Sequence, residues 1–164
     1  MSLNAAPIDM IRVARIAELL AGRRETVAVA ESSAGGLISA ALLSLPGASA
    51  YYLGGGVIYT GRARETLLGI TPSMLGEVRS ATEEMALLQA TALRTRLGAD
   101  WGLAETGATG PKGNRYGDAA GHCCVAVSGS RQASRTMETG STDRMESMAA
   151  FANAALALLE EVLG

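Results

Sequence analysis

The chain of 164 residues has little of the residue types that proteins use for crosslinks and metal binding. It has one histidine, His122, and its two cysteines, Cys123 and Cys124, are neighbours, so neither zinc-site spacing nor a long-range disulfide is available. We therefore expect reduced thiols in the core and no metal site. Lys112 is the only lysine among 14 basic residues. This scarcity bears on proton transfer, because the remaining basic residues are arginines, which stay protonated at any working pH.

Charge is also scarce. Charged residues make up 18% of the chain, and the net charge is −2 with a pI near 5.5. Without an excess of positive charge, nucleic acid and membrane surfaces are disfavoured as partners. Residues 32–59, which lie within the longest uncharged stretch, contain several glycines and Pro46, which exclude a transmembrane helix. The N-terminus lacks a basic segment followed by an apolar one, so we expect a cytoplasmic protein.

Short apolar runs alternate with helical patterns, and hydrophobic residues make up 48% of the chain, enough for a sizeable core. Buried strands are predicted at residues 26–30, 54–59 and 101–106, followed by a hairpin of residues 122–128 and 133–138. Ser80 and Glu83 have the spacing of a capping box. Helices are predicted at residues 8–20, with Gly22 just past the helix end, and at residues 35–44, 62–68, 83–97 and 142–163. This order predicts a single α/β domain over residues 1–164, a three-layer α/β/α sandwich around a mixed, mostly parallel sheet.

Two glycine-rich turns follow predicted strands: residues 31–36 (ESSAGG) and residues 106–111 (TGATGP). Ligands of open α/β sheets bind beyond the carboxyl ends of the strands, so the two turns together predict a pocket between them. The first turn leads into a helix, whose unpaired N–H groups would favour an anion or an oxyanion. Either turn alone is more often a plain connection, and it is their pairing that favours function.

Ser32, at the sharp turn from strand to helix, has the placement of a hydrolase nucleophile. A serine nucleophile needs a base. His122 lies in a strand-like run and is interpreted as a buried residue, which leaves Lys112 and Tyr59 as candidates. The loop of residues 107–113 lacks the Gly-Lys-Ser/Thr ending of a phosphate loop, which excludes a nucleoside triphosphate hydrolase.

Several segments, in order, resemble the CinA C-terminal domain family, the nicotinamide-nucleotide amidases. They are residues 30–36 (AESSAGG), 45–50 (LPGASA), 57–60 (VIYT), 67–70 (LLGI) and 105–111 (ETGATGP), with Gly121. The resemblance covers the chain from about residue 10 to its end. It implies an α/β/α domain that hydrolyses the carboxamide of nicotinamide mononucleotide (NMN) to nicotinate mononucleotide and ammonia, with no metal or organic cofactor. Members are often dimeric, so the resemblance is compatible with a homo-oligomer.

The resemblance also implies roles for individual residues. Ser32 would be the nucleophile, with Tyr59 beside it and Arg64 at the position of the family's lysine, the expected base. Arg144 suits a phosphate, although a solvent-exposed charge at a helix start explains it equally well. Further substrate contacts would come from Ser33, Gly35, Gly36, Thr106, Gly107, Ala108, Thr109 and Gly110.

Departures from the family pattern leave the function open, and one of them is Asp118, which stands where the resemblance implies a second lysine. Ser33-Ala34 replaces the usual Cys-Thr, and Arg64 cannot readily accept a proton. One reading is an amidase with an unorthodox base. The other is a member that has lost hydrolysis and binds a nucleotide-like anion as a sensor or interaction module.

Overall fold

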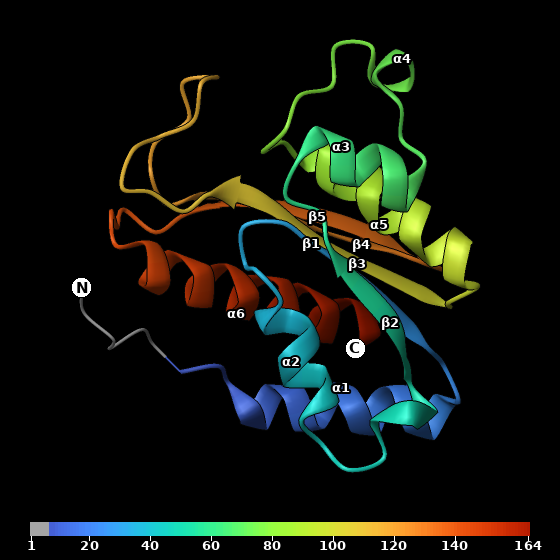
Figure 1. Ribbon diagram of the computed structural model, residues 1–164. Helices are drawn as coiled ribbons and strands as arrows, with labels where there is room; N and C mark the ends of the chain where they lie inside the picture. The colour runs from blue at the N-terminus through green and yellow to red at the C-terminus, as the bar shows by residue number, and fades with distance from the viewer. Residues whose placement is uncertain (1–6) are drawn as a thin grey trace.

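The computed structural model describes residues 7–164 and contains a five-stranded sheet in the order β2-β1-β3-β4-β5 (Figure 1). β1 pairs in parallel with both β2 and β3, whereas β4 is antiparallel to β3 and β5, so β4 alone runs against the other four strands. The predicted sandwich with a mixed, mostly parallel sheet is therefore confirmed. The strands are β1 (Val27–Glu31), β2 (Tyr52–Val57), β3 (Trp101–Ala108), β4 (His122–Ser128) and β5 (Gln132–Glu138).

Helices lie on both faces of the sheet (Figure 1). On one face are α1 (Met10–Arg23), α2 (Leu37–Leu43) and α6 (Arg144–Leu163). On the other are α5 (Glu83–Leu97), the short α3 (Gly61–Ala63) and the π-helical turn η2 (Arg64–Leu68). The short elements η1 (Ala48–Ala50) and α4 (Pro72–Leu75) lie in connections. Within residues 7–164, no helix is both long and apolar enough to cross a lipid bilayer.

The alternation of side chains along β1 explains the two layers. Val27 and Val29 belong to the larger core, which α1, α2 and α6 cover, whereas Ala28 and Ala30 face α5. Small residues on that second face let α5 approach the sheet closely: a Cβ at Gly102 would lie 2.1 Å from the carbonyl oxygen of Ala90. The segment just before α5 lies near the carboxyl end of β3, where the Ala81 N–H donates to the Thr106 hydroxyl at 3.2 Å.

Several elements differ from the predictions. The strand predicted as buried over residues 54–59 is the edge strand β2, Tyr52–Val57, whose residues alternate between half-buried and exposed. The helix predicted over residues 62–68 is the short α3 followed by the π-helical turn η2.

Thr82, not Ser80, caps α5, because its side chain accepts a hydrogen bond from the Met85 N–H at 3.2 Å. The predicted capping box was therefore wrong, although Gly98 ends this helix in a left-handed conformation as expected. The first helix runs past Gly22 to Arg23, and Arg24 takes the left-handed position with φ of 56°. Both cysteines are buried free thiols, as predicted.

Candidate functional site

Two buried carboxylates hold the turn that follows β1. Glu31, which is fully buried, accepts hydrogen bonds from the backbone N–H groups of Gly36 (2.9 Å), Ile38 (3.0 Å) and Ser39 (2.7 Å). These are donors at the start of α2. The expectation that this helix start offers free N–H groups to an anion was therefore wrong, because the protein's own carboxylate already occupies them.

Glu105 reaches the same turn from the neighbouring strand β3. Its carboxylate accepts from the backbone N–H groups of Ser32 (3.0 Å) and Ala34 (2.8 Å) and from the hydroxyl of Ser33. Burial raises the pKa of Glu105, while these three hydrogen bonds act in the opposite direction. The position of Ser32 is thus set by a side chain that is distant in sequence.

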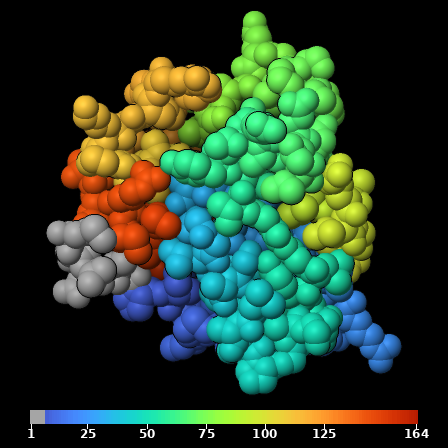
Figure 2. Space-filling model, in the orientation of Figure 1, coloured from blue at the N-terminus to red at the C-terminus, as the bar shows by residue number. Residues whose placement is uncertain are grey.

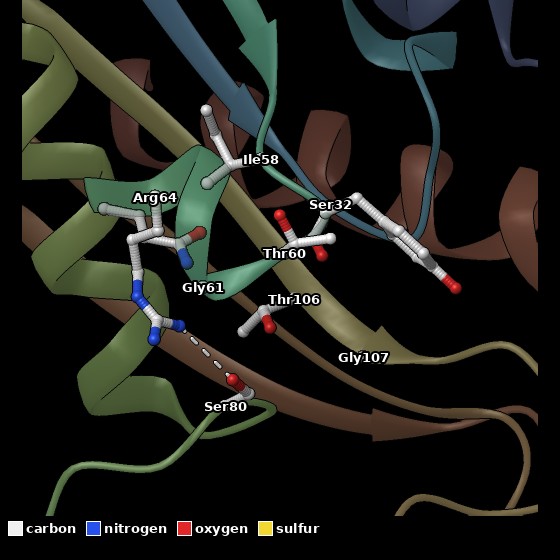
Figure 3. Close-up of a pocket in the computed structure, with 10 residues that line it drawn as sticks. Ser32, Ile58, Thr60, Gly61, Arg64, Ser80, Thr106 and Gly107 are labelled. Atoms are coloured by element: carbon white, nitrogen blue, oxygen red, sulfur yellow. Dashed lines mark hydrogen bonds between the residues drawn. The ribbon is translucent and has the colours of Figure 1, made fainter. Parts of the chain in front are cut away.

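A cavity of about 200 Å³ lies between the two predicted turns, and we call it the first cavity. The predicted pocket is confirmed, since both Ser32 and Thr106 line it. Figure 3 shows the guanidinium of Arg64 directed toward Ser80, with Thr106 beside them. The full lining is Ser32, Ile58, Tyr59, Thr60, Gly61, Arg64, Ser80, Gln89, Thr106 and Gly107.

A second cavity of about 180 Å³ shares Tyr59 and Gly107 with the first. Arg144, the first residue of α6, donates to the carbonyl oxygen of Gly110 at 2.9 Å and to the hydroxyl of Tyr59 at 3.1 Å. The chain segments that contribute to the two cavities, far apart in sequence, meet on the face shown in Figure 2. The second cavity is lined by Ser33, Tyr59, Gly107, Ala108, Thr109, Gly110, Lys112, Gly113, Asn114 and Arg144.

Arg64 contributes the positive charge of the first cavity. Its Nη1 lies 3.4 Å from the Ser80 hydroxyl and 3.8 Å from the Met85 sulfur, both weak contacts. Its Nε is buried and has no hydrogen-bond partner within residues 7–164. None of the residues that line this cavity is a histidine or a lysine, so the cavity offers no conventional nitrogen base to Ser32.

The other predicted proton carriers lie elsewhere. Lys112 lines the second cavity, and Tyr59, 61% exposed, lines both. His122 lines neither: its Nε2 donates to the Ala81 carbonyl at 2.9 Å and its Nδ1 contacts the Glu138 carboxylate at 2.5 Å. Burial by itself lowers the pKa of His122, but these two hydrogen bonds together with the negative charges of Glu138 and Asp118 outweigh it, and the pKa is raised. The reading of His122 as a satisfied buried residue is confirmed.

Contacts between two loops hold Ser80 in the wall of the first cavity. Arg79 forms an ion pair with Asp118 at 2.6 Å and lies over the ring of Tyr116, 5.3 Å from its centre. The next residue but one, Ala81, donates its N–H to the Thr106 hydroxyl at 3.2 Å. The segment before α5 is therefore fastened to β3 and to the loop of residues 109–121.

The predicted site residues thus divide into three groups. Ser32, Tyr59, Arg64, Thr106 and Gly107 meet at the first cavity, and Ser33, Ala108, Thr109, Gly110 and Arg144 meet at the second. Gly35 and Gly36 line neither cavity. They shape the turn, where both adopt positive φ values of 68° and 103°.

Sequence reasoning missed Glu105, Ser80 and Gln89. Two of them could have been found from the sequence pattern. Glu105 is a charged residue within an apolar strand, and Gln89 is a polar residue on the inward face of a helix. Ser80 was assigned to the helix cap instead. Within residues 7–164, no three His, Cys, Asp or Glu side chains are grouped so that they could hold a metal ion.

Comparison with known proteins gives a consistent result. Residues 11–163 match the family model of the CinA C-terminal domain. A CinA-like protein of Chloroherpeton thalassium is 35% identical over 163 residues, which are 96% of this chain and 39% of that protein. One of Synechococcus sp. is 37% identical over 121 residues, 74% of this chain and 29% of that protein. The chain thus spans well under half the length of these curated relatives.

Solved structures agree with the sequence matches. The crystal structure of the competence/damage inducible protein CihA from Agrobacterium tumefaciens has a TM-score of 0.88 with 29% sequence identity and covers 99% of both chains. A competence or damage-inducible protein from Enterobacter asburiae has a TM-score of 0.89 with 27% identity, covering 96% of this chain and 99% of that one. The overall fold and the sequence therefore point to the same family.

Proposed function

The chain belongs to the CinA C-terminal domain family, and from this premise we propose that it is an amidohydrolase that converts NMN to nicotinate mononucleotide and ammonia. The observation that carries the proposal is the position of Ser32. Its side chain lines the first cavity, and no residue within 7–164 forms a hydrogen bond with its hydroxyl oxygen. A hydroxyl that lines a cavity and is not engaged elsewhere suits a nucleophile.

In this reaction, the Ser32 hydroxyl oxygen adds to the carbonyl carbon of the substrate's carboxamide. The C–N bond then breaks, ammonia leaves with the serine proton, and water hydrolyses the resulting ester to a carboxylate. Arg64 faces the same cavity and is suited to donate hydrogen bonds to the oxygen that becomes negative. It cannot take the serine proton, because it stays charged, so Tyr59 and Lys112 are the remaining candidates for the base.

The second cavity suits the substrate's phosphate. Arg144 and Lys112 line it and contribute two positive charges. The second cavity shares Tyr59 and Gly107 with the first cavity. Arginine binds phosphate oxygens with two parallel hydrogen bonds, which fixes the position of the group as well as its charge. A nucleotide with its pyridine ring in the first cavity and its phosphate in the second would span both.

The test is incubation of the purified protein with NMN, with ammonia and nicotinate mononucleotide both quantified. We expect turnover in the wild type and none in Ser32→Ala. Ser130→Ala is the matched control, because Ser130 is exposed in the turn between β4 and β5. Turnover that survives Ser32→Ala would refute the role of this serine.

A second candidate function is favoured by Arg64 itself. Among the residues that line the first cavity Arg64 is the one cation, and since it cannot act as a base, the cavity also suits the binding of an anion without hydrolysis. The same protein samples distinguish the two readings. NMN binding by calorimetry together with no ammonia release would favour the sensor or interaction module over the amidase.

A further inference from the structure

Gln89 is a polar residue on the inward face of α5. Its side chain is only 2% exposed, and it lines the first cavity together with Ser32 and Arg64. Position 89 is an exception among the buried residues on this face of the helix. The other buried residues of α5 are apolar: Met85, Ala86, Ala90 and Leu93.

The buried amide of Gln89 is not satisfied. Its Oε1 has no hydrogen-bond partner within residues 7–164. Leaving a buried acceptor without a partner costs stability, so native proteins contain few such atoms, and each calls for an explanation. The Nε of Arg64 is a second unsatisfied atom in the wall of the same cavity, and it is a donor. Two residues that line the first cavity therefore each carry a buried polar atom without a partner, an acceptor on Gln89 and a donor on Arg64.

We propose that Gln89 is a specificity-determining residue that recognises the primary carboxamide of the substrate. The inference rests on the proposed amidase function and names the group that this cavity selects. A primary carboxamide carries N–H donors and a carbonyl acceptor, and the glutamine side chain carries the same two groups. Rotation about the last bond of the side chain is broad and inexpensive, so Gln89 can turn its carbonyl oxygen toward the substrate's N–H and its own N–H toward the substrate's carbonyl.

This arrangement separates substrate from product. Hydrolysis replaces the amide nitrogen by an oxygen, so the carboxylate product presents only acceptors to Gln89. The hydrogen bond to Oε1 is then lost, and two oxygen atoms face each other. Arg64 has the opposite preference, since a guanidinium favours a carboxylate over a neutral amide. Gln89 therefore keeps a cationic cavity selective for the carboxamide.

The experiment measures binding of NMN and of nicotinate mononucleotide by calorimetry in the Ser32→Ala protein, where hydrolysis is blocked. To this background we add Gln89→Leu, which removes both polar groups, or Gln89→Met, which has a similar length and keeps the site filled. Gln132→Leu is the matched control, because the chain's other glutamine is exposed on β5. Thermal unfolding checks that each variant is folded.

We expect both Gln89 variants to lower the ratio of NMN affinity to nicotinate mononucleotide affinity by about 10-fold, the effect of one or two hydrogen bonds, and Gln132→Leu to leave it unchanged. An unchanged ratio in folded Gln89 variants that still bind NMN would overturn the inference and leave the amidase function standing, with Gln89 a structural residue. If Ser32→Ala binds neither nucleotide and the wild type releases no ammonia, the proposed function fails and the inference fails with it.

Discussion

Removal of the Glu105 carboxylate should destabilise the protein more than an ordinary core substitution. Glu105→Leu leaves three donors without an acceptor: the N–H groups of Ser32 and Ala34 and the hydroxyl of Ser33. A buried donor left unsatisfied costs about 1–3 kcal/mol, so the three together cost at least about 3 kcal/mol. That is a large share of the ~5–15 kcal/mol by which domains are stable.

Urea denaturation followed by circular dichroism measures this loss. With a denaturant slope near ~2 kcal/mol/M, a loss of about 3 kcal/mol lowers the unfolding midpoint by about 1.5 M. Glu105→Gln is the control, because its carbonyl oxygen still accepts from the two backbone groups, and it should lose less than half as much. A midpoint for Glu105→Leu within experimental error of the wild type would refute the view that Glu105 holds the Ser32 turn.

The wild type and Glu105→Gln together also test the charge of Glu105. Because burial raises its pKa, the folded protein keeps the proton to a higher pH than the unfolded chain does. The stability that this proton contributes is complete below the unfolded value of about 4.5 and is lost as the pH rises through the folded pKa. As the pH rises from about 4.5 through the folded pKa of Glu105, the free energy of unfolding of the wild type should therefore fall relative to that of Glu105→Gln. Parallel stability curves for the two proteins would contradict the raised pKa.

Three further predictions concern separate parts of the molecule. Arg64→Lys should raise kcat on NMN by about 100-fold, the size of a general-base contribution, whereas an unchanged rate would mean that another group is the base. The raised pKa of His122 contributes stability that is complete below pH 6.5 and is lost as the pH rises through the folded pKa. His122→Asn should therefore make the free energy of unfolding depend less on pH above 6.5, and an unchanged pH dependence would argue against a charged His122. Gly102→Ala should lower the thermal midpoint by several degrees, since its Cβ would meet the Ala90 carbonyl at 2.1 Å; an unchanged midpoint would mean that α5 shifts freely.

Sequence alone determined the order of the elements and the pairing of the two turns. Strand and helix patterns repeat over a few neighbouring residues, so the chain itself carries the information that assigns β1, α5 and β3. The rule that parallel strands end at the same sheet edge then predicts Ser32 near Thr106, and both residues line the first cavity.

Only the tertiary structure decided what surrounds Ser32. The N–H groups at the start of α2 looked available for a ligand, yet Glu31 occupies three of them, and Glu105 approaches the turn from another strand. Gln89 belongs to the cavity because small residues let α5 lie close to the sheet. A hydrogen-bonding group takes whichever partner the fold brings within about 3 Å, and that partner can stand anywhere in the sequence. Local patterns therefore located the site, while long-range contacts determined its chemistry.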